Sequence, residues 1–315
     1  MSVVIPTHNR AEYLRSAVAS VLEQTYQDFE IVVVDDASRD NTAEVLAGFG
    51  DPRIKCIRHE AGKGDGGARN TGIVNARGEY IAFLDDDDQW LPEKLALQVA
   101  TLDRSPAHVG GVYTGQFDVD ESGNQIVKVC HAMRRGNLLE HFFQEASIVT
   151  STLLFRRACF ATVGLFDESI PYCSDYDMWI RIAEKYHFEC VGQPLVKYRL
   201  HANKLSENLP FSIKGRELIL SKYQADFCRY PRAYARACRV LGEVYCYAGD
   251  VKKGRAAFLK ALKTYPLEIR SYCHLCLSLF GARHFRALRE TAAKLLAPLR
   301  ARKVRSEVQK ITAQA

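Results

Sequence analysis

Four consecutive aspartates, Asp85 to Asp88, are the residues of this sequence with the clearest capacity for chemistry. Adjacent carboxylates repel one another, and a divalent cation would offset that repulsion. Hard cations such as Mg²⁺ and Mn²⁺ prefer oxygen ligands and can hold the phosphates of a substrate at the same time. The run therefore predicts a metal and phosphate site, and the alternative is a solvated acidic loop.

Four further features could act together with this acidic run. Asp36 follows an apolar segment, where its carboxylate could accept a hydrogen bond from a ribose hydroxyl or a base N–H, or could cap a helix. The glycine-rich stretch 63–70 contains Arg69, a charge-assisted donor for phosphate if this stretch is a mobile loop rather than a plain turn. Asp175 begins an apolar helical segment as either a general base or a cap. His201 could have a structural role or could belong to the functional site.

The elements that must position these residues alternate between strand and helix over the first hundred positions. Such alternation predicts a doubly wound α/β layer structure. Ligands of such sheets bind outside the carboxyl ends of the strands, so Asp36 and the acidic run are expected on one rim. From about 110 to 205 the pattern is mixed, with one clear helix at 177–186. In the first hundred residues, strands are expected at 3–6, 30–35, 54–58 and 80–84, and helices at 11–24, from 40, at 68–76 and from 91.

The residues after Phe211 have the pattern of helices alone. One stretch within them has the spacing of a tetratricopeptide repeat. Because about three repeats are needed for independent stability, this region is expected to pack on the first domain. The predicted domains are an α/β domain over 1–210 and a helical, tetratricopeptide-like region over 211–315. The residues with the repeat spacing are Leu241, Gly242, Tyr245, Phe258, Ala261 and Pro266.

Charge is divided unevenly between these two parts. Residues 1–210 contain 21 Lys and Arg against 30 Asp and Glu, a net charge of −9, whereas residues 211–315 contain 22 against 7, a net charge of +15. From Arg283 to Lys310 there are nine basic and two acidic residues. This basic helical segment predicts either contact with an anionic membrane surface or a helix that caps the repeat. Its apolar face comprises Leu288, Ala292, Leu295, Leu296 and Leu299.

Several protein classes are disfavoured by what the sequence does not contain. No signal-peptide pattern and no apolar run of about 20 residues is visible, so we expect a cytoplasmic protein, free or peripheral on the inner membrane. The ten cysteines are scattered and predict buried, reduced thiols. The absence of a Gly-x-Gly-x-x-Gly after the first strand speaks against a dinucleotide enzyme. The absence of a Walker sequence speaks against a nucleotide triphosphatase.

Four motifs, in order over about residues 1–205, resemble the family-2 glycosyltransferases, a large inverting group with the GT-A fold. Each motif alone is weak, but the four in sequence are specific. The sequence departs from the family pattern at three places. Ser174 stands where the family often has Glu, His8 stands where Tyr is commoner, and the stretch 64–67 contains more glycine than usual. The motifs are Val3 to Arg10, Val33 to Ser38, Phe83 to Asp88, and Gly164 to Glu168 followed by Asp175 to Arg181.

The resemblance implies a role for each matching residue. Asp175 would be the catalytic base, Asp87 would bind the metal with the diphosphate, and His201 would lie near the metal. Asp86 would face the ribose, and Asp85 would be a further ligand. The nucleotide-sugar contacts implied in this way are Pro6, Thr7, His8, Asp36, Arg69, Asp85 and Asp86.

The function that the resemblance implies is the inverting transfer of a sugar from a nucleotide-diphosphate sugar, most simply a UDP-sugar. The acceptor would be a hydroxyl of a glycan or lipid-linked glycan in bacterial surface polysaccharide assembly, with Mn²⁺ or Mg²⁺ as cofactor and no nucleic acid involved. One alternative is a nucleotidyltransferase, although that class usually has a glycine-rich, basic loop where Pro6 to Arg10 stand here. The other is an inactive helical-repeat interaction protein, against which the presence of Asp36, Asp87 and Asp175 speaks.

Overall fold

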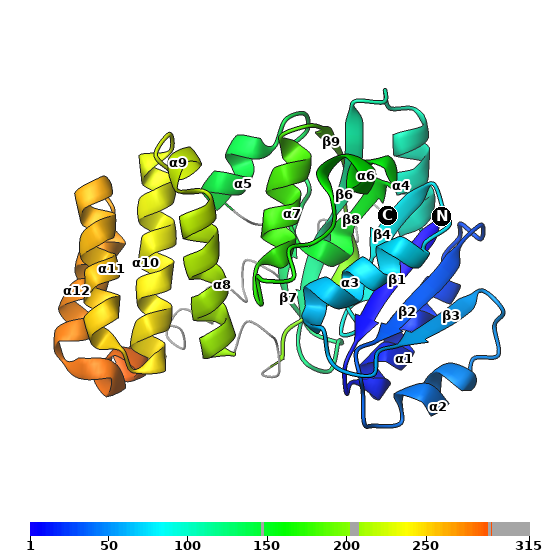
Figure 1. The fold of residues 1–315 in the computed structure, drawn as a ribbon, viewed down its shortest axis with the longest axis horizontal. Helices are drawn as coiled ribbons and strands as arrows, with labels where there is room; N and C mark the ends of the chain where they lie inside the picture. The colour runs from blue at the N-terminus through cyan, green and yellow to red at the C-terminus, as the bar shows by residue number, and fades with distance from the viewer. Residues whose placement is uncertain (146–147, 202–207, 289–290, 292–315) are drawn as a thin grey trace. The chain divides into compact units, whose positions relative to one another are not determined.

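The computed structural model describes residues 1–145, 148–201, 208–288 and 291 (Figure 1). The chain forms two compact units. The first comprises Met1–Leu139, Ser147–Glu168 and Asp177–His201, and the second comprises Glu140–Ala146, Ser169–Tyr176 and the chain from Ala202 onward. The division into domains at residue 210 stays a prediction. Two short segments from the first 210 residues belong to the second, helical unit.

The first unit is built on a nine-stranded mixed sheet with the order β3-β2-β1-β4-β8-β6-β9-β5, in which β7 pairs with β6. Strands β1 to β4 are parallel to one another, whereas β8 runs antiparallel to both β4 and β6. The α/β class is therefore confirmed. The strands are β1 Ser2–Thr7, β2 Glu30–Asp35, β3 Ile54–Arg58, β4 Tyr80–Phe83, β5 Gln89–Trp90, β6 Val109–Val119, β7 Ile126–Cys130, β8 Leu153–Arg156 and β9 His187–Arg199.

Helices cover both faces of the central parallel strands because the apolar residues of β2 point alternately to the two faces. Ile31 and Val33 of β2 pack in one core cluster with the buried side of α1 and with α4. Val32 and Val34 point to the opposite face and pack with Ala68 of α3. The helices of this unit are α1 Ala11–Leu22, α2 Thr42–Ala47, α3 Gly64–Asn75, α4 Lys94–Asp103, α6 Ala158–Val163 and most of α7 Ser174–Ala183, with a 3₁₀ turn η1 Thr150–Thr152.

The glycine-rich stretch is the first turn of a helix, so the expectation of a loop there is wrong. Helix α3 begins at Gly64, four residues before the expected start at Ala68. Its glycines allow close packing: a Cβ added at Gly72 would overlap the side chain of Val4 in β1. This contact brings α3 against the sheet beside the carboxyl end of β1.

Lys94 at the start of α4 is fully buried. Its Nζ donates to Gln98 Oε1 at 2.6 Å and lies 3.9 Å from the ring centroid of Trp90. Burial holds the pKa of Lys94 well below its usual value of about 10.4. As the pH falls below that value, the unfolded chain takes up a proton that the folded chain resists, so the folded state loses stability.

We therefore expect Lys94→Met to remove a pH dependence of folding. Between pH 7 and pH 9 the wild-type protein should gain up to about 1.4 kcal/mol per pH unit in unfolding free energy relative to the variant. Urea unfolding of both proteins at several pH values measures this difference. If the unfolding free energies of the two proteins changed with pH in the same way, the amine of Lys94 would titrate normally and the expectation would be wrong.

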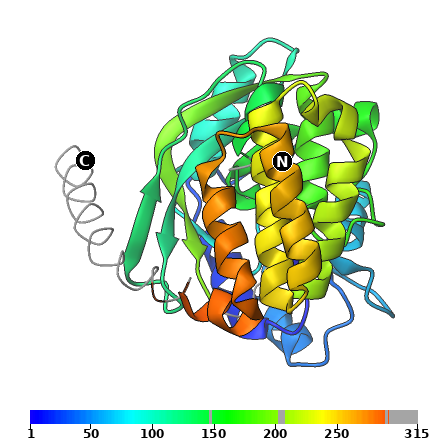
Figure 2. The ribbon, with the colours of Figure 1, turned by 90° about the vertical axis from the view of Figure 1, so that its left-hand side faces the viewer.

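The second unit is helical in the residues that the structure describes, as predicted from Phe211 onward. The side chain of Asn208 caps α8 by accepting from the N–H of Phe211, and that of Asp250 caps α11. Helices α10, α11 and α12 (yellow to orange) pack side by side (Figure 2). The tetratricopeptide character of this region stays a prediction. Its helices are α5 Leu139–Glu145, α8 Leu209–Lys222, α9 Gln224–Phe227, α10 Pro231–Ala248, α11 Val251–Thr264 and α12 Ile269–Leu279.

Two further expectations concern the whole chain. Among the described residues, no helix has both the length and the apolarity needed to cross a membrane. All ten cysteines lie in described residues and are free, as expected. Four of them are exposed rather than buried, which corrects the expectation of buried thiols: Cys56, Cys228, Cys273 and Cys276.

Candidate active site

The acidic run lies in the turn between β4 and β5, at the edge of the sheet where the parallel strands end. Asp86, Asp87 and Asp88 are buried, and Asp85 is half-buried. Neighbouring strand β1 ends at Thr7, whose Oγ1 donates to Asp86 Oδ2 at 2.7 Å. The structure therefore joins two segments 79 residues apart at one rim, the arrangement that parallel strands produce.

Arg10 and His201 hold the middle of the acidic run. Arg10 Nη1 lies 3.1 Å from both Asp86 Oδ1 and Asp87 Oδ2. His201 Nε2 lies 2.7 Å from Asp87 Oδ2, and because a carboxylate only accepts, Nε2 is the donor. Burial raises the pKa of Asp86 to about 7, and Asp87 adds to this, while Arg10 and Thr7 oppose it. The guanidinium of Arg10 thus offsets part of the repulsion between Asp86 and Asp87.

Asp88, for which the sequence indicates no role, is held by two residues that motif reasoning missed. Ser151 Oγ in η1 donates to Asp88 Oδ2 at 2.6 Å and accepts from the N–H of Asp85 at 3.1 Å. The backbone N–H of Arg199 donates to Asp88 Oδ1 at 3.1 Å, and its Nε donates to the carbonyl of Asp87. Hydrogen bonds from β9 and from η1 therefore hold the turn that contains Asp88.

One oxygen each from Asp85, Asp87 and Asp88 lie within 4.8 Å of one another. Three carboxylate oxygens at this spacing are a donor set that suits Mg²⁺ or Mn²⁺. The grouping includes Asp88 in place of Asp86, whose oxygens bond Thr7 and Arg10 instead.

Asp36 binds its own chain at the start of α3. Its Oδ1 accepts from the N–H of Lys63 at 2.8 Å and lies 2.7 Å from His59 Nδ1, and its Oδ2 accepts from the N–H of Gly64 at 2.9 Å. A carboxylate has about four acceptor positions, so one remains for a ligand. Asp36 also fixes His8, whose Nδ1 donates to the Asp36 carbonyl at 2.6 Å.

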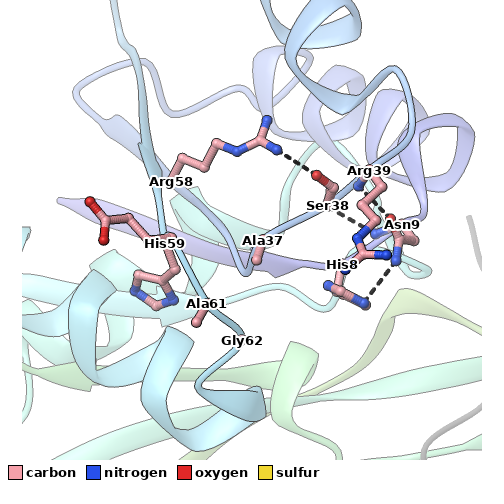
Figure 3. Close-up of a pocket in the computed structure, with 10 residues that line it drawn as sticks. His8, Asn9, Ala37, Ser38, Arg39, Arg58, His59, Ala61 and Gly62 are labelled. Atoms are coloured by element: carbon pink, nitrogen blue, oxygen red, sulfur yellow. Dashed lines mark hydrogen bonds between the residues drawn. The ribbon is translucent and has the colours of Figure 1, made fainter.

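A cavity of about 640 Å³ opens beside Asp36, between the loops that follow β1, β2 and β3 (Figure 3). Its volume lies in the range of ligand pockets. Ala37 and Asn9 have left-handed backbones, with φ of 63° and 53°, a strained geometry that concentrates at functional sites. The lining residues are His8, Asn9, Ala37, Ser38, Arg39, Arg58, His59, Glu60, Ala61 and Gly62.

The walls of this cavity are basic. Arg58 is held in place by donating from Nη2 to the carbonyl of Ser38 at 2.6 Å, and Arg39 stands on the neighbouring loop (Figure 3). The two arginines outnumber the single carboxylate of the lining, that of Glu60, and this balance suits an anionic ligand. Of the lining residues, only His8 had been singled out from the sequence.

Arg69 and Pro6 complete the predicted residues of this unit. Arg69 is buried in α3, forms an ion pair with Asp65 and donates from Nη2 to Asp85 Oδ1 at 2.7 Å. It therefore lies against the acidic run. Pro6 is buried in β1, in register with Val34 of β2.

Asp175 is assigned to the second compact unit, whereas the other predicted site residues are assigned to the first. It is the second residue of α7, which begins at Ser174, and it lies within the first turn, where a helix favours negative charge. Cys173 just before the helix has φ of 68°, and burial raises the pKa of its thiol to about 12. Next to Cys173 in the sequence, the ring of Tyr172 has the guanidinium of Arg216 at 5.1 Å from its centroid.

The first unit thus carries a carboxylate cluster and a cavity at the carboxyl ends of its parallel strands, where α/β sheets bind their ligands. Residues 2–164 match the family model for glycosyl transferase family 2. The chain therefore belongs to glycosyl transferase family 2, and it is a glycosyltransferase, as the resemblance implied.

The chain is also similar to individual glycosyltransferases. It is 34% identical to an uncharacterised glycosyltransferase of Rickettsia prowazekii over 85% of this chain and 83% of that protein. It is 27% identical to the UDP-Glc:alpha-D-GlcNAc-diphosphoundecaprenol beta-1,3-glucosyltransferase WfgD of Escherichia coli, over 81% of this chain and 98% of WfgD. The chain spans only 35% of the length of two longer rickettsial relatives.

The fold is also that of solved glycosyltransferases. The mannosyltransferase PcManGT of Pyrobaculum calidifontis, solved with GDP-Man and Mn²⁺, superposes with a TM-score of 0.57 at 18% identity, over 94% of this chain and 84% of that chain. This likeness confirms the GT-A fold class.

Proposed function

We propose that this glycosyltransferase moves a sugar from a UDP-sugar to a hydroxyl of a lipid-linked glycan in surface polysaccharide assembly, with inversion at the anomeric carbon. The observation that carries the proposal is the network of Thr7, Asp86, Asp87 and His201 on the rim that borders the basic cavity. The similarity to WfgD, a glucosyltransferase with a UDP-Glc donor and a diphosphoundecaprenol-linked acceptor, supports the same choice of donor and acceptor.

The donor nucleotide is proposed to occupy the basic cavity. A nucleoside there would meet the remaining acceptor position of Asp36 and the segment from Pro6 to His8. Asp86 would face the ribose, with Thr7 fixing its carboxylate at 2.7 Å. Arg69 already contacts Asp85 and would stand near the phosphates as a charge-assisted donor.

A divalent cation, Mn²⁺ or Mg²⁺, is proposed to be held by Asp87 with Asp85 and Asp88, and with His201 beside them. The oxygen donor set fits such a cation, and the Mn²⁺ bound to the structurally similar PcManGT supports the assignment. When bound, such a cation supplies neutralisation of the charge that develops on the diphosphate leaving group. Arg10, which bridges Asp86 and Asp87, would adjust its position to make room for the phosphates.

Asp175 is proposed as the general base, on the strength of the family resemblance. Its carboxylate would take the proton of the acceptor hydroxyl while the oxygen of that hydroxyl attacks the anomeric carbon. The bond from that carbon to the diphosphate breaks in the same step, and the nucleoside diphosphate leaves with the electron pair. A single displacement of this kind inverts the anomeric centre.

Ser151→Ala tests the proposed fastening of the metal-binding turn. The variant leaves an oxygen of the buried Asp88 and the N–H of Asp85 without their hydroxyl partner. Because groups that support metal ligands typically contribute 10- to 100-fold in affinity, we expect Mn²⁺ to bind at least about tenfold more weakly. Titration followed by electron paramagnetic resonance measures this. Ser271→Ala, which alters a buried serine of α12, is the matched control, and equal Mn²⁺ affinities in both variants would refute the assignment.

The choice of donor is tested by a thermal-shift screen of nucleotide sugars with and without Mn²⁺. UDP-sugars should raise the melting temperature more than other nucleotides, and more with the metal than without it, because ligands that bind the native state stabilise it. Stabilisation by nucleoside triphosphates alone would favour a nucleotidyltransferase. A lack of response to any nucleotide would favour an inactive interaction protein.

Peripheral membrane contact through the basic C-terminal segment remains a proposal. Of the segment Arg283 to Lys310, only residues 283–288 and 291 are described, so its predicted apolar face from Ala292 to Leu299 lies outside the described residues. Such a contact would bring the enzyme to a lipid-linked acceptor, which is held in the membrane.

A further inference from the structure

Helix α12 turns mostly polar side chains to the interior of its unit, where Leu275 and Leu277, both half-buried, pack against the core cluster of Cys246, Phe258 and Phe285. Its buried residues are Ser271, His274 and Ser278, all polar. In contrast, Ile269 and Leu279 have 72% and 64% of their surface exposed. A helix of a soluble unit normally turns its apolar stripe toward the core. The exposed side of α12 is therefore built for something other than the core of its own unit.

Polar contacts hold the inner side of α12 and fix which way the helix faces. Arg255 of α11 donates from Nη2 to the carbonyl of Ser278 at 2.8 Å. His274 Nδ1 lies 3.2 Å from the carboxylate of Glu243 in α10, and the His274 ring packs 5.7 Å from that of Phe258. Rotating the helix to bury its apolar side would break these contacts. The outward position of the apolar side chains is thus fixed by the structure.

The exposed apolar residues of α12 lie on one side of the helix. They follow one another at intervals of one, three or four positions, which places them on the same side of a helix. Exposed Leu267 lies just before the helix and extends the surface. Contiguous exposed apolar surface of this kind marks an interaction site. We call it the α12 outer face, and it comprises Ile269, Tyr272, Cys273, Cys276, Leu279 and Phe280.

The stretch of sequence that contains the α12 outer face is basic, although Lys260 itself lies against α10, with its Nζ 5.0 Å from the centroid of the Tyr234 ring. Residues 259–288 contain five Lys and Arg, and their single acidic residue is Glu268, which pairs with Arg239 at 2.9 Å. Two copies of this face brought together would place like charges against each other, which disfavours a homodimer. Apolar side chains within a cationic surround match the surface of an anionic lipid bilayer. The basic residues are Lys260, Lys263, Arg270, Arg283 and Arg286.

We propose that the α12 outer face docks the enzyme onto the surface of an anionic lipid bilayer. Ile269, Leu279 and Phe280 would enter the boundary between headgroups and acyl chains, while Arg270 and Arg283 contact anionic headgroups. The proposal rests on the proposed function in one respect, because a lipid-linked acceptor makes docking useful. It concerns described residues and does not depend on the segment beyond residue 291.

Binding to vesicles tests the docking surface directly. The full chain is mixed at low salt with vesicles of phosphatidylcholine containing about a third phosphatidylglycerol, and with vesicles of phosphatidylcholine alone, and binding is measured by co-sedimentation. We expect binding to the anionic vesicles only. The double variant Leu279→Glu with Phe280→Glu should bind at least tenfold more weakly. Val74→Glu changes an apolar residue of α3 that is 70% exposed, and this matched control should bind like the wild type.

The charged surround is tested separately. Arg270→Gln and Arg283→Gln should each weaken binding to the anionic vesicles by about fivefold, since one basic residue near such a surface contributes about that factor. Raising the salt concentration should weaken wild-type binding in the same direction. Binding that is unchanged in both variants would overturn the role assigned to these residues.

The native thiols report which face meets the bilayer. Cys273 and Cys276 are exposed on the α12 outer face, whereas Cys56 and Cys228 are exposed on other elements. Anionic vesicles should slow the alkylation of Cys273 and Cys276 severalfold and leave that of Cys56 and Cys228 unchanged, as read by peptide mass spectrometry. Equal protection of all four thiols, or protection without vesicles that depends on protein concentration, would overturn the proposal, the latter in favour of a dimer.

Failure of docking and failure of the proposed function give different results. The Leu279→Glu, Phe280→Glu variant should release nucleoside diphosphate at the wild-type rate with an acceptor dispersed in detergent, but more slowly with an acceptor embedded in vesicles. Wild-type protein that binds vesicles yet shows no turnover in detergent would contradict the proposed function alone. Turnover in detergent without any vesicle binding by the wild type would contradict docking alone.

Discussion

Replacement of Asp175 by Asn should abolish sugar transfer while donor binding survives. Asn has nearly the shape of Asp but cannot take the proton of the acceptor hydroxyl. General bases contribute about 10²- to 10⁴-fold to rate, so kcat should fall by at least about 10²-fold. Asp175 lies within the first turn of α7 and is not part of the cavity lining, so the dissociation constant of the donor should stay within about twofold.

The measurement compares kcat with donor affinity in the same protein preparation. Asp250→Asn is the matched control, since it makes the same chemical change in the second unit at the cap of α11, and Asn caps a helix as well as Asp does. That control should retain wild-type turnover. Normal turnover by Asp175→Asn would remove Asp175 from the mechanism, and a loss of donor binding that matches the loss of rate would assign it a structural role.

The second large effect is expected from Asp87→Ala, which should lose the metal-dependent part of donor binding. Asp87 contributes one oxygen to the triad with Asp85 and Asp88, and it is contacted by Arg10 and His201. In the presence of Mn²⁺ we expect donor affinity to fall by at least about 100-fold, since loss of a supporting contact alone already removes 10- to 100-fold. Without metal the loss should be small, because the variant also removes a negative charge near the diphosphate.

Calorimetry of UDP-sugar binding with and without Mn²⁺ separates these two contributions. Asp51→Ala is a control carboxylate, since Asp51 pairs only locally with Arg53 two residues along the chain. In that control Mn²⁺ should enhance donor binding as in the wild type. If Mn²⁺ still enhanced binding to Asp87→Ala by the wild-type factor, the assignment of Asp87 to the cation would be wrong.

The part of the fold that follows from local pattern was predictable. The strand expected at 30–35 coincides with β2, because its unbroken apolar segment is buried in a sheet covered on both faces, and the strand expected at 54–58 coincides with β3. The start of α3 was not predictable, since glycine disfavours helices and the Asp36 carboxylate that accepts from the N–H groups of Lys63 and Gly64 stands 27 and 28 positions earlier in the chain. The assignment of 169–176 to the helical unit depends on tertiary contacts that no local pattern encodes.

The candidate site was predictable where its residues sit at strand ends in recognisable motifs. Thr7, Asp86, Asp87 and His201 do meet in the structure. Ser151 could not be found, because nothing distinguishes it from other serines and it reaches Asp88 across 63 positions of the chain. A stronger signal existed for Arg199 and Arg58. The first stands two residues before His201 and the second ends a strand whose neighbours carry site residues.

The central claim is that the chain transfers a sugar and releases a nucleoside diphosphate. The most direct measurement incubates the full chain with a UDP-sugar, Mn²⁺ and an acetylglucosamine linked through diphosphate to a polyprenol in detergent, and quantifies both products. We predict equimolar formation of UDP and the extended lipid-linked disaccharide, and neither product with Asp175→Asn. Release of pyrophosphate, or no product from any nucleotide sugar that the thermal-shift screen shows to bind, would contradict the account.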